Sequence, residues 1–491
     1  MAGAFETVIG LEVHSQLLTQ SKLFCGCPAR FGAQANEHVC PVCLGLPGAL
    51  PVPNGAAVDM AMRAALALGC QVRTQSVFER KNYFYPDLAK GYQISQFALP
   101  LSEHGELSVE VDGATRTVSI VRIHMEEDAA KNIHGVGSGT DTLVDFNRAG
   151  VPLIEIVSGP DLRSAAEAEA YLRRLREVLM FCGVNDGNLE EGSFRCDANV
   201  SIRPVGQQQL GTRTELKNIN SFRFVRKAIE YEVSRQKAVV SGGGTIVQET
   251  RTWLESSATT VSMRSKEEAM DYRYFPDPDL PPLQVDEARV DAVRAALPEL
   301  PVDKRARYVA TMGLTESDAG VMTGHPEIAC YFEGVVSELC KQLGNGAKLA
   351  SVGKRVANFI QSEALRYVQT EGLAASLPGA PEALAELLAL VEDGTVSGKM
   401  AKSVFSDMVQ SGRSARALVD EKGLSQVSDA GQLESVIRDV LASSPDNVAA
   451  YRGGKTGLLG WFVGQVMKAT KGAANPKLAN ELLRKLLDEE A

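Results

Sequence analysis

Four cysteines near the N-terminus have the spacing of a metal site. Cys25 and Cys27 are separated by one residue, and Cys40 and Cys43, separated by two, follow after a gap of twelve residues. Two close pairs of thiolates on short turns suit a tetrahedral zinc ion, and four sulfur ligands leave no position open for a substrate. The spacing therefore predicts a closed, structural zinc site. The alternative is four reduced cysteines that bind no metal.

Polar and apolar side chains alternate along four predicted strands, which places the polar ones on a common face of each strand. Glu12 and His14 share this face in the first strand. The second strand runs through Glu126 into Glu127 and Asp128. The polar residues of the other two strands are Arg195, Asp197, Asn199, Ser201 and Arg203 on the third, and Arg213, Glu215 and Lys217 on the fourth.

These faces hold Glu, His, Asp, Asn and Arg side chains, which bind hard cations and phosphate. They predict a Mg²⁺ site at a nucleotide, with nearby cations that neutralise phosphate oxygens during phosphoryl transfer. The predicted magnesium ligands are Glu12, His14, Glu127 and Glu215, and the predicted phosphate contacts are Arg195, Arg203 and Lys217. The alternative is an antiparallel sheet with one face in solvent, which gives the same alternation.

Standard phosphate loops and nucleophilic hydrolase motifs are missing from the sequence. Gly454-Lys455-Thr456 matches the end of a Walker A loop, but Ala449 stands where the first glycine belongs. A nucleotide would therefore bind to the strand faces. We also find no Ser-His-Asp, Cys-His or serine-rich amidase arrangement.

Two changes of pattern divide the chain. Residues from Phe5 to about Leu283 are rich in short alternating segments, with one clear helix that begins at a capping box, Ser164 to Glu167. The proline-rich run from Phe275 to Pro282 ends this region, and a helical apolar period follows from about Val285. We predict a strand-rich α+β domain over residues 1–294 with the cysteine cluster as an insertion, then two all-α domains over 295–396 and 397–491.

The composition is that of a folded soluble protein, with 44% hydrophobic and 23% charged residues. The formal net charge of −10 argues against a protein that coats DNA or other nucleic acid through bulk positive charge. The sequence has neither a signal peptide nor an apolar run long enough to span a membrane. We therefore expect a cytoplasmic protein with no membrane contact.

One C-terminal stretch is basic. Between residues 447 and 480 the chain has no acidic residue, and its positive side chains are Arg452, Lys455, Lys468, Lys471 and Lys477. Such a stretch predicts local contacts with RNA phosphates. The alternative is an ordinary solvated face of a small helical domain.

Eight segments resemble the B subunits of aspartyl/glutamyl-tRNA amidotransferases, in the expected order and over nearly the whole chain. The segments are Ile9 to His14, Arg80 to Asp87, Gln93 to Phe97, His124 to Asp128, Arg195 to Ser201, Thr214 to Asn218, Asp271 to Pro276 and Met467 to Gly472. The resemblance implies a cradle-shaped catalytic domain with a glutamine-synthetase-like active site, a helical domain and a small tail that binds tRNA.

The implied chemistry converts misacylated Glu-tRNA(Gln) or Asp-tRNA(Asn) into the amide. ATP and Mg²⁺ would activate the side-chain carboxylate as an acyl phosphate, and ammonia would then attack it. The implied partners are an amidase, the A subunit, which frees ammonia from glutamine, and a small C subunit. Not every member has the four cysteines, so the zinc prediction rests on their presence here.

The resemblance also extends the candidate site. Glu126 and Asp128 would support the magnesium shell, beside the catalytic cations Arg195, Arg203 and Lys217. The predicted nucleotide or substrate contacts are Lys81, Asn82, Tyr83, Asp197, Asn199 and Ser201. Two other functions remain open on the sequence: a zinc-containing RNA-binding protein without chemistry of its own, and a free-standing ligase for a small carboxylic acid.

Overall fold

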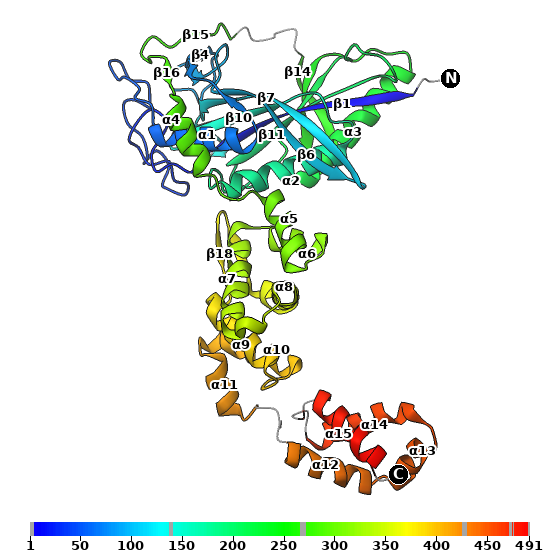
Figure 1. The fold of residues 1–491 in the computed structure, drawn as a ribbon. Coiled ribbons are helices and arrows are strands. Elements are labelled where there is room, and N and C mark those ends of the chain that lie inside the picture. The colour runs from blue at the N-terminus through cyan, green and yellow to red at the C-terminus, as the bar shows by residue number, and fades with distance from the viewer. Residues whose placement is uncertain are drawn as a thin grey trace. The chain divides into compact units, whose positions relative to one another are not determined.

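The computed structural model describes residues 4–136, 141–265, 272–424, 430–470, 474 and 476–489. They form two compact units, one of residues 1–303 with 371–373, the other of residues 304–370 with 374–491 (Figure 1). The first unit combines a large sheet with helices, which confirms the predicted α+β class, and the second is mainly helical. Among the described residues, no helix has both the length and the apolar content that crossing a membrane requires.

A nine-stranded sheet forms the centre of the first unit. In sheet order its strands are β14 (Thr259–Ser265), β13 (Glu249–Leu254), β12 (Thr214–Lys217), β11 (Phe194–Pro204), β1 (Phe5–Gln16), β10 (Pro152–Ser158), β7 (Ala114–Glu127), β6 (Ser102–Val111) and β2 (Gln71–Val72). Neighbouring strands are antiparallel except β12 and β13, which are parallel. All four strands predicted from alternation belong to this sheet.

Two long helices, α2 (Ala165–Phe181) and α3 (Phe222–Ser241), pack on the sheet through contacts with β6 and β11 (Figure 1). The predicted capping box is present, because Ser164 Oγ accepts a hydrogen bond from the Glu167 N–H at 3.1 Å. Leu11, Val13 and Tyr171 meet in the shared core. Because successive strand residues point to opposite faces, this packing leaves the polar residues of β1, β7 and β11 on the other face.

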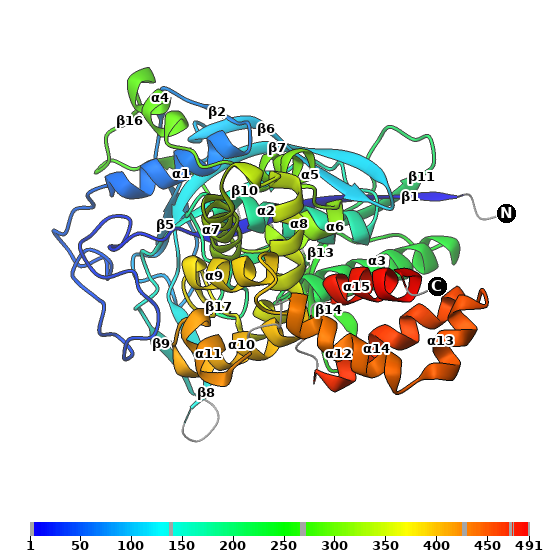
Figure 2. The ribbon, with the colours of Figure 1, turned by 60° about the horizontal axis from the view of Figure 1, so that its bottom comes forward.

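Smaller elements surround the sheet. Helices α1 (Gly55–Ala67) and α4 (Glu287–Ala295) lie side by side (Figure 2). The remaining strands pair as β4 (Glu79–Asn82) with β5 (Tyr92–Ser95) and β15 (Phe275–Pro276), β3 (Gln75–Ser76) with β16 (Leu283–Gln284), and β8 (Lys131–Val136) with β9 (Asp141–Asp145). The loop with the four cysteines connects β1 to α1.

The second unit has two hydrophobic cores. The helices of the first are α5 (Pro301–Met312), α6 (Glu316–Met322), α7 (Pro326–Leu343), α8 (Leu349–Phe359), α9 (Pro381–Glu392), α10 (Gly398–Ser411) and α11 (Ala415–Lys422), with the single turns η2 (Gly344–Gly346), η3 (Ile360–Ala364) and η4 (Leu365–Tyr367) and the hairpin β17 (Gln369–Glu371) and β18 (Ala374–Ser376). The helices of the second are α12 (Ala430–Ala442), α13 (Pro445–Arg452), α14 (Leu459–Ala469) and α15 (Pro476–Glu489), with the turn η5 (Thr456–Leu458).

The first of these cores extends past the predicted boundary between residues 396 and 397. Val404 and Phe405 of α10 are buried in it together with Leu387 of α9. The three-domain division of the chain therefore stays a prediction.

Candidate active site on the polar face of the sheet

The register of the sheet aligns polar side chains from several strands. One row crosses β7, β10, β1 and β11 through His124, Glu155, His14 and Arg195. A second row lies two residues away: Glu12, which precedes His14 by two positions in β1, lies opposite Asp197 of β11. The spacing of two places both rows on the same face. The strands therefore bring together side chains that lie up to about 190 residues apart in the chain, such as Glu12 and Asp197.

Glu126 of β7 joins three residues of the first row in a largely buried group of two histidines and two carboxylates. Nε2 of His14 lies 3.4 Å from a carboxylate oxygen of Glu126 and 3.4 Å from one of Glu155. Nε2 of His124 lies 3.4 Å from the same Glu155 oxygen. Burial acts to lower the pKa of His14, but these carboxylates outweigh it and raise the pKa to about 10. We call His14, His124, Glu126 and Glu155 the His-Glu cluster.

The carboxylates of the His-Glu cluster are held in their charged form. Burial acts to raise the pKa of Glu126, but Lys81 and the two histidines lower it. His124 and His14 likewise hold the pKa of Glu155 well below its usual range against burial. Ligand atoms of His14, Glu126 and Glu155 lie within 4.8 Å of one another. One nitrogen and two oxygens at this spacing fit a divalent cation.

A second group consists of Glu12, Asp197 and Glu215, which we call the tricarboxylate cluster. One oxygen from each lies within 4.8 Å of the others. Lys217 donates a hydrogen bond to Asp197 and lies 3.2 Å from Glu215, and the Asn199 amide donates to Glu12 at 3.0 Å. Burial, followed by the charges of the neighbouring carboxylates, raises the pKa of Glu12. An oxygen-only donor set whose charges repel one another suits Mg²⁺.

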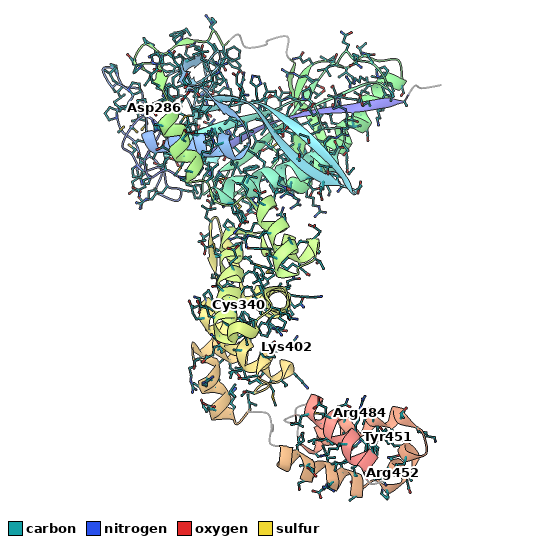
Figure 3. All side chains as sticks on the ribbon, viewed as in Figure 1. Asp286, Cys340, Lys402, Tyr451, Arg452 and Arg484 are labelled. Atoms are coloured by element: carbon teal, nitrogen blue, oxygen red, sulfur yellow. The ribbon has the colours of Figure 1, made fainter. Side chains whose placement is uncertain are left out.

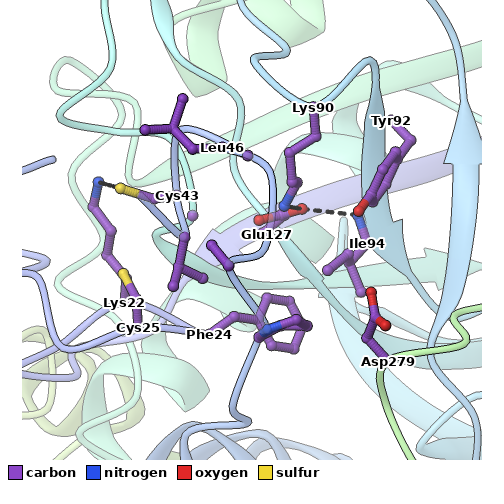
Figure 4. A pocket seen from close by; sticks show the side chains of 15 residues that line it. Lys22, Phe24, Cys25, Cys43, Leu46, Lys90, Tyr92, Ile94, Glu127 and Asp279 are labelled. Atoms are coloured by element: carbon purple, nitrogen blue, oxygen red, sulfur yellow. Dashed lines mark hydrogen bonds and ion pairs between the residues drawn. The ribbon is translucent and has the colours of Figure 1, made fainter. Parts of the chain in front are cut away.

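Glu127 lies outside both clusters. It accepts a hydrogen bond from the Ile94 N–H at 2.9 Å and forms an ion pair with Lys90 (Figure 4). Both residues line a cavity of about 190 Å³ that also reaches Cys25 and Cys43. The structure thus brings together three of the predicted magnesium ligands, Glu12 and Glu215 in one group and His14 beside it, but separates Glu127 from them.

Asp128 and Arg195 bond to each other at the end of the first row. Nη2 of Arg195 lies 2.6 Å from a carboxylate oxygen of Asp128, and the Gln16 amide donates to the same oxygen at 2.7 Å. Burial acts to raise the pKa of Asp128, but Arg195 and Arg148 lower it. Arg203 lies at the far end of β11, where it bonds to Glu6 at 2.7 Å.

A cleft opens beside the tricarboxylate cluster. It has a volume of about 510 Å³ and is lined by Gly10, Glu12, Asn199, Ser201 and Arg213, among others. Apolar and hydrogen-bonding side chains both line it, as in sites for small organic ligands. The predicted contacts Asn199 and Ser201 therefore face this cleft, whereas Lys81, Asn82 and Tyr83 belong to the small sheet on the other side of the His-Glu cluster.

The four cysteines of the N-terminal loop converge. Their sulfur atoms lie within 4.8 Å of one another. The buried Lys22 Nζ lies 3.6 Å from the Cys43 sulfur (Figure 4), and the Cys40 N–H donates to this sulfur at 3.1 Å. A hydrogen bond from the Cys25 thiol, with these two donors, lowers the pKa of Cys43 to about 4 despite burial. Four sulfurs and a neighbouring ammonium fit a zinc ion, whose complex with four thiolates is negatively charged.

The basic residues of the tail lie around its small core. Arg452, labelled in Figure 3, is exposed, as are Lys455 and Lys468. The Arg452 Nε atom donates to the Leu487 carbonyl at 3.2 Å. Lys471 and the side chain of Lys477 lie outside the described residues. The exposed Arg484 and Lys485 of α15 add positive charge beyond the stretch that the sequence pattern indicated.

Known proteins resemble this chain over most of its length. Residues 7–291 match the family model described as GatB/GatE catalytic domain, and residues 342–487 match the one described as GatB domain. The chain is 56% identical over 486 residues to the B subunit of the aspartyl/glutamyl-tRNA(Asn/Gln) amidotransferase of Solidesulfovibrio magneticus, covering 98% of this chain and 99% of the relative. For the corresponding protein of Syntrophotalea carbinolica the identity is 54% over 491 residues, all of both chains. The chain belongs to this family of B subunits. The resemblance inferred from the sequence is confirmed.

Two participants in this candidate site were not indicated by the sequence pattern. Glu155 is the only acid in the apolar strand Pro152 to Ser158, and a carboxylate in such a run signals a buried functional group. Lys90, the partner of Glu127, lies in a loop whose position no local pattern reveals.

The Asp128 ion pair is expected to stabilise the fold. Substitution Asp128→Ala leaves Arg195 and Gln16 without their buried acceptor, so the free energy of unfolding should fall by about 2 kcal/mol, below the usual range for buried pairs because Arg195 is partly exposed. Chemical denaturation measures this change. The pair of Asp59 with Arg289, which is more exposed than the Asp128 pair, is the control, since Asp59→Ala should cost about 0.5 kcal/mol. Equal losses in the two variants would contradict this account.

Proposed function

We propose that this chain phosphorylates the side-chain carboxylate of Glu or Asp esterified to a non-cognate tRNA and then converts it to the amide with ammonia. The observation that carries the proposal is the pair of neighbouring cation-binding groups on one sheet face, the tricarboxylate and His-Glu clusters, with Lys217 and Lys81 beside them. Phosphoryl transfer needs this combination of acids and cations.

The reaction balances in two steps. A carboxylate oxygen of the substrate attacks the γ-phosphorus of ATP, and the bond to ADP breaks. Ammonia then attacks the carbonyl carbon of the acyl phosphate, inorganic phosphate leaves, and the amide loses a proton. The cations of the site lower the repulsion between the attacking carboxylate and the phosphate chain, which is the main obstacle to the first step.

Two donor sets would hold Mg²⁺ in this scheme. The tricarboxylate cluster would bind the ion that accompanies ATP, and His14, Glu126 and Glu155 would bind a second. Bound there, magnesium would supply positive charge to the transferring phosphoryl group. Compared with the ligands predicted from the sequence, this set leaves out Glu127, which bonds to Lys90, and adds Asp197, Glu126 and Glu155. A cation on Asp197 and Glu215 would release Lys217 to contact phosphate, and Arg195 would do the same at the neighbouring row.

The cleft beside Glu12 is our candidate for the nucleotide. It offers backbone at Gly10, where a Cβ atom would come no closer than 3.8 Å to its neighbours, and polar groups on Asn199 and Ser201. A phosphate chain that leaves this cleft over the tricarboxylate cluster points at the His-Glu cluster, where the substrate carboxylate would lie. The polar face of the sheet would then form the cradle of a glutamine-synthetase-like site.

Ammonia must reach this site from a partner. The chain carries no serine or cysteine nucleophile arrangement in its sequence, so an amidase, the A subunit, would release ammonia from glutamine, with the small C subunit completing the complex. A full-length match to subunits of a tRNA amidotransferase supports this assembly.

The cysteine cluster would hold a structural zinc ion. The ion would tie together a loop of about 38 residues between β1 and α1. Lys22 would balance part of the negative charge of four thiolates.

The exposed cations of the tail would contact tRNA through its phosphates. They lie on helices α13, α14 and α15 and on the turn between the first two. Contacts of this kind follow the shape of the RNA and carry no base specificity.

Glu12→Gln should lower ATP-dependent amidation about a hundredfold or more, because one ligand charge of the tricarboxylate cluster is lost. Glutamine hydrolysis by the partner should persist. The measurement is ADP release with misacylated tRNA and glutamine in the assembled complex. Glu110→Gln, at an exposed position of β6, is the matched control and should keep wild-type rates. Near-normal amidation by the Glu12 variant would refute the assignment.

Metal analysis tests the zinc site. The full chain, purified under reducing conditions without chelator, should contain about one zinc ion. Cys43→Ser should lose it, whereas Cys330→Ser, at an isolated exposed cysteine of α7, should retain it. A zinc content far below one in the wild-type chain would exclude the site.

Deletion of the chain after residue 424 tests the tail. This cut removes the second core of the helical unit and leaves the first intact, which a cut after 396 would not. Assembled with its partners, the shortened protein should bind tRNA more weakly and with a smaller dependence on salt. Lys455→Gln alone should lower the slope of log affinity against log salt by about one. Unchanged affinity and slope after the deletion would place tRNA binding elsewhere.

A further inference from the structure

Four aromatic side chains stand together beside the His-Glu cluster. The rings of Phe97 and Tyr274 are stacked, with centroids 4.5 Å apart and planes at 10°. Tyr272 lies edge-on to Tyr274 at 6.1 Å and to Tyr83 at 5.7 Å. We call Tyr83, Phe97, Tyr272 and Tyr274 the aromatic wall. They follow β4 and β5 and precede β15, so the small three-stranded sheet carries all of them.

The turn that presents the two C-terminal tyrosines of this wall is strained. Arg273, between them, has a φ of 42°, a conformation that costs free energy for any residue except glycine. Asn82 holds the turn in place. Its backbone N–H donates to the Tyr272 carbonyl at 2.9 Å, and its side-chain amide donates to the Arg273 carbonyl at 2.9 Å. Strain that neighbouring groups maintain in this way is typical of binding sites.

Two cations accompany the wall. The Arg122 guanidinium lies 5.4 Å from the centroid of Phe97, and Lys81 Nζ lies 5.2 Å from that of Tyr272. Neither makes a hydrogen bond or an ion pair within the part of the chain that the structure describes, and the Arg122 Nε atom is buried. Buried donors normally have acceptors. These two cations are therefore suited to an anionic ligand.

The aromatic wall is accessible to solvent and lies close to the His-Glu cluster. Phe97 is 48% exposed. Burial, together with the nearby charges of Glu126 and Glu155, raises the pKa of Tyr274 to about 12, although Lys81 opposes the shift. A ligand on the wall therefore lies next to the His-Glu cluster. Aromatic stacks flanked by unpaired cations are the recurring means of binding single-stranded nucleic acid, since rings stack on bases and cations contact phosphates.

We propose that the aromatic wall binds the unpaired 3′ end of the aminoacylated tRNA, with the terminal base added to the stack of Phe97 and Tyr274 and the adjoining phosphates contacted by Arg122 and Lys81. This inference rests on the proposed function, because it is the ester at that terminal nucleotide that must place the amino acid over the His-Glu cluster. A protein partner would cover the rings but would need acidic side chains for both cations.

A fluorescent base tests the stack directly. The complete amidotransferase, assembled with this full-length chain, is titrated with tRNA that carries 2-aminopurine in place of the terminal adenine. Stacking quenches this fluorophore, so the wild type should quench it. Phe97→Ala should lose at least half of the quenching and raise KM for the misacylated tRNA about tenfold. Phe97→Tyr should preserve both, and Phe31→Ala, at an exposed ring of the cysteine loop, should behave as wild type.

Arg122→Gln gives a second readout, a fall of about one in the salt slope of tRNA binding. Quenching and KM that stay at wild-type values in both Phe97→Ala and Tyr274→Ala would overturn the proposal, and would leave a protein partner as the occupant. Amidation by the wild-type complex is measured in the same preparations. If the wild type amidates the tRNA and the variants equal it in quenching and KM, only the role of the aromatic wall is refuted. If the wild type does not amidate the tRNA, the proposed function is refuted.

Discussion

The carboxylates on the polar face of the sheet stand close together because positive side chains are interleaved with them. His14 and His124 lie between Glu126 and Glu155, and Lys217 bridges Asp197 and Glu215. Without these cations, burial would push the acids toward their neutral forms and the site would lose its charge. This offset of negative by positive charge depends on three other parts of the structure. They are the helices that pack on the other face, the register of the strands, and the small sheet that carries Lys81.

The positive side chains offset the effect of burial on pKa at some of these acids but not at others. Glu126 and Glu155 have pKa values below their usual range, whereas that of Glu12 is raised by burial and by its neighbours. A cation bound beside Glu12 would offset the repulsion from its neighbouring carboxylates. The pKa of His14 rises from 6.5 to about 10, so its contribution to stability is fully present below pH 6.5 and is lost as the pH rises through about 10.

Much of this arrangement was predictable from local patterns. Alternation identified β1, β7, β11 and β12 and the polar face that each presents, and a capping box identified the start of α2. The partners of each acid were not predictable, because they depend on register and on loops. Glu127 directly follows Glu126, so alternation places it on the opposite face, where it pairs with Lys90. Glu155 enters the site from a strand whose other residues are apolar or small. Pairing across strands distant in sequence carries no local signal.

The central claim is that the chain makes an acyl phosphate, and the fate of one oxygen atom tests it most directly. Misacylated tRNA whose amino-acid side-chain carboxylate is labelled with ¹⁸O is amidated by the complete complex with ATP, and the inorganic phosphate is examined by mass spectrometry. Activation by phosphorylation transfers one side-chain oxygen to phosphate, so the account predicts one labelled phosphate for each amide formed. Amide formation with unlabelled phosphate would contradict it.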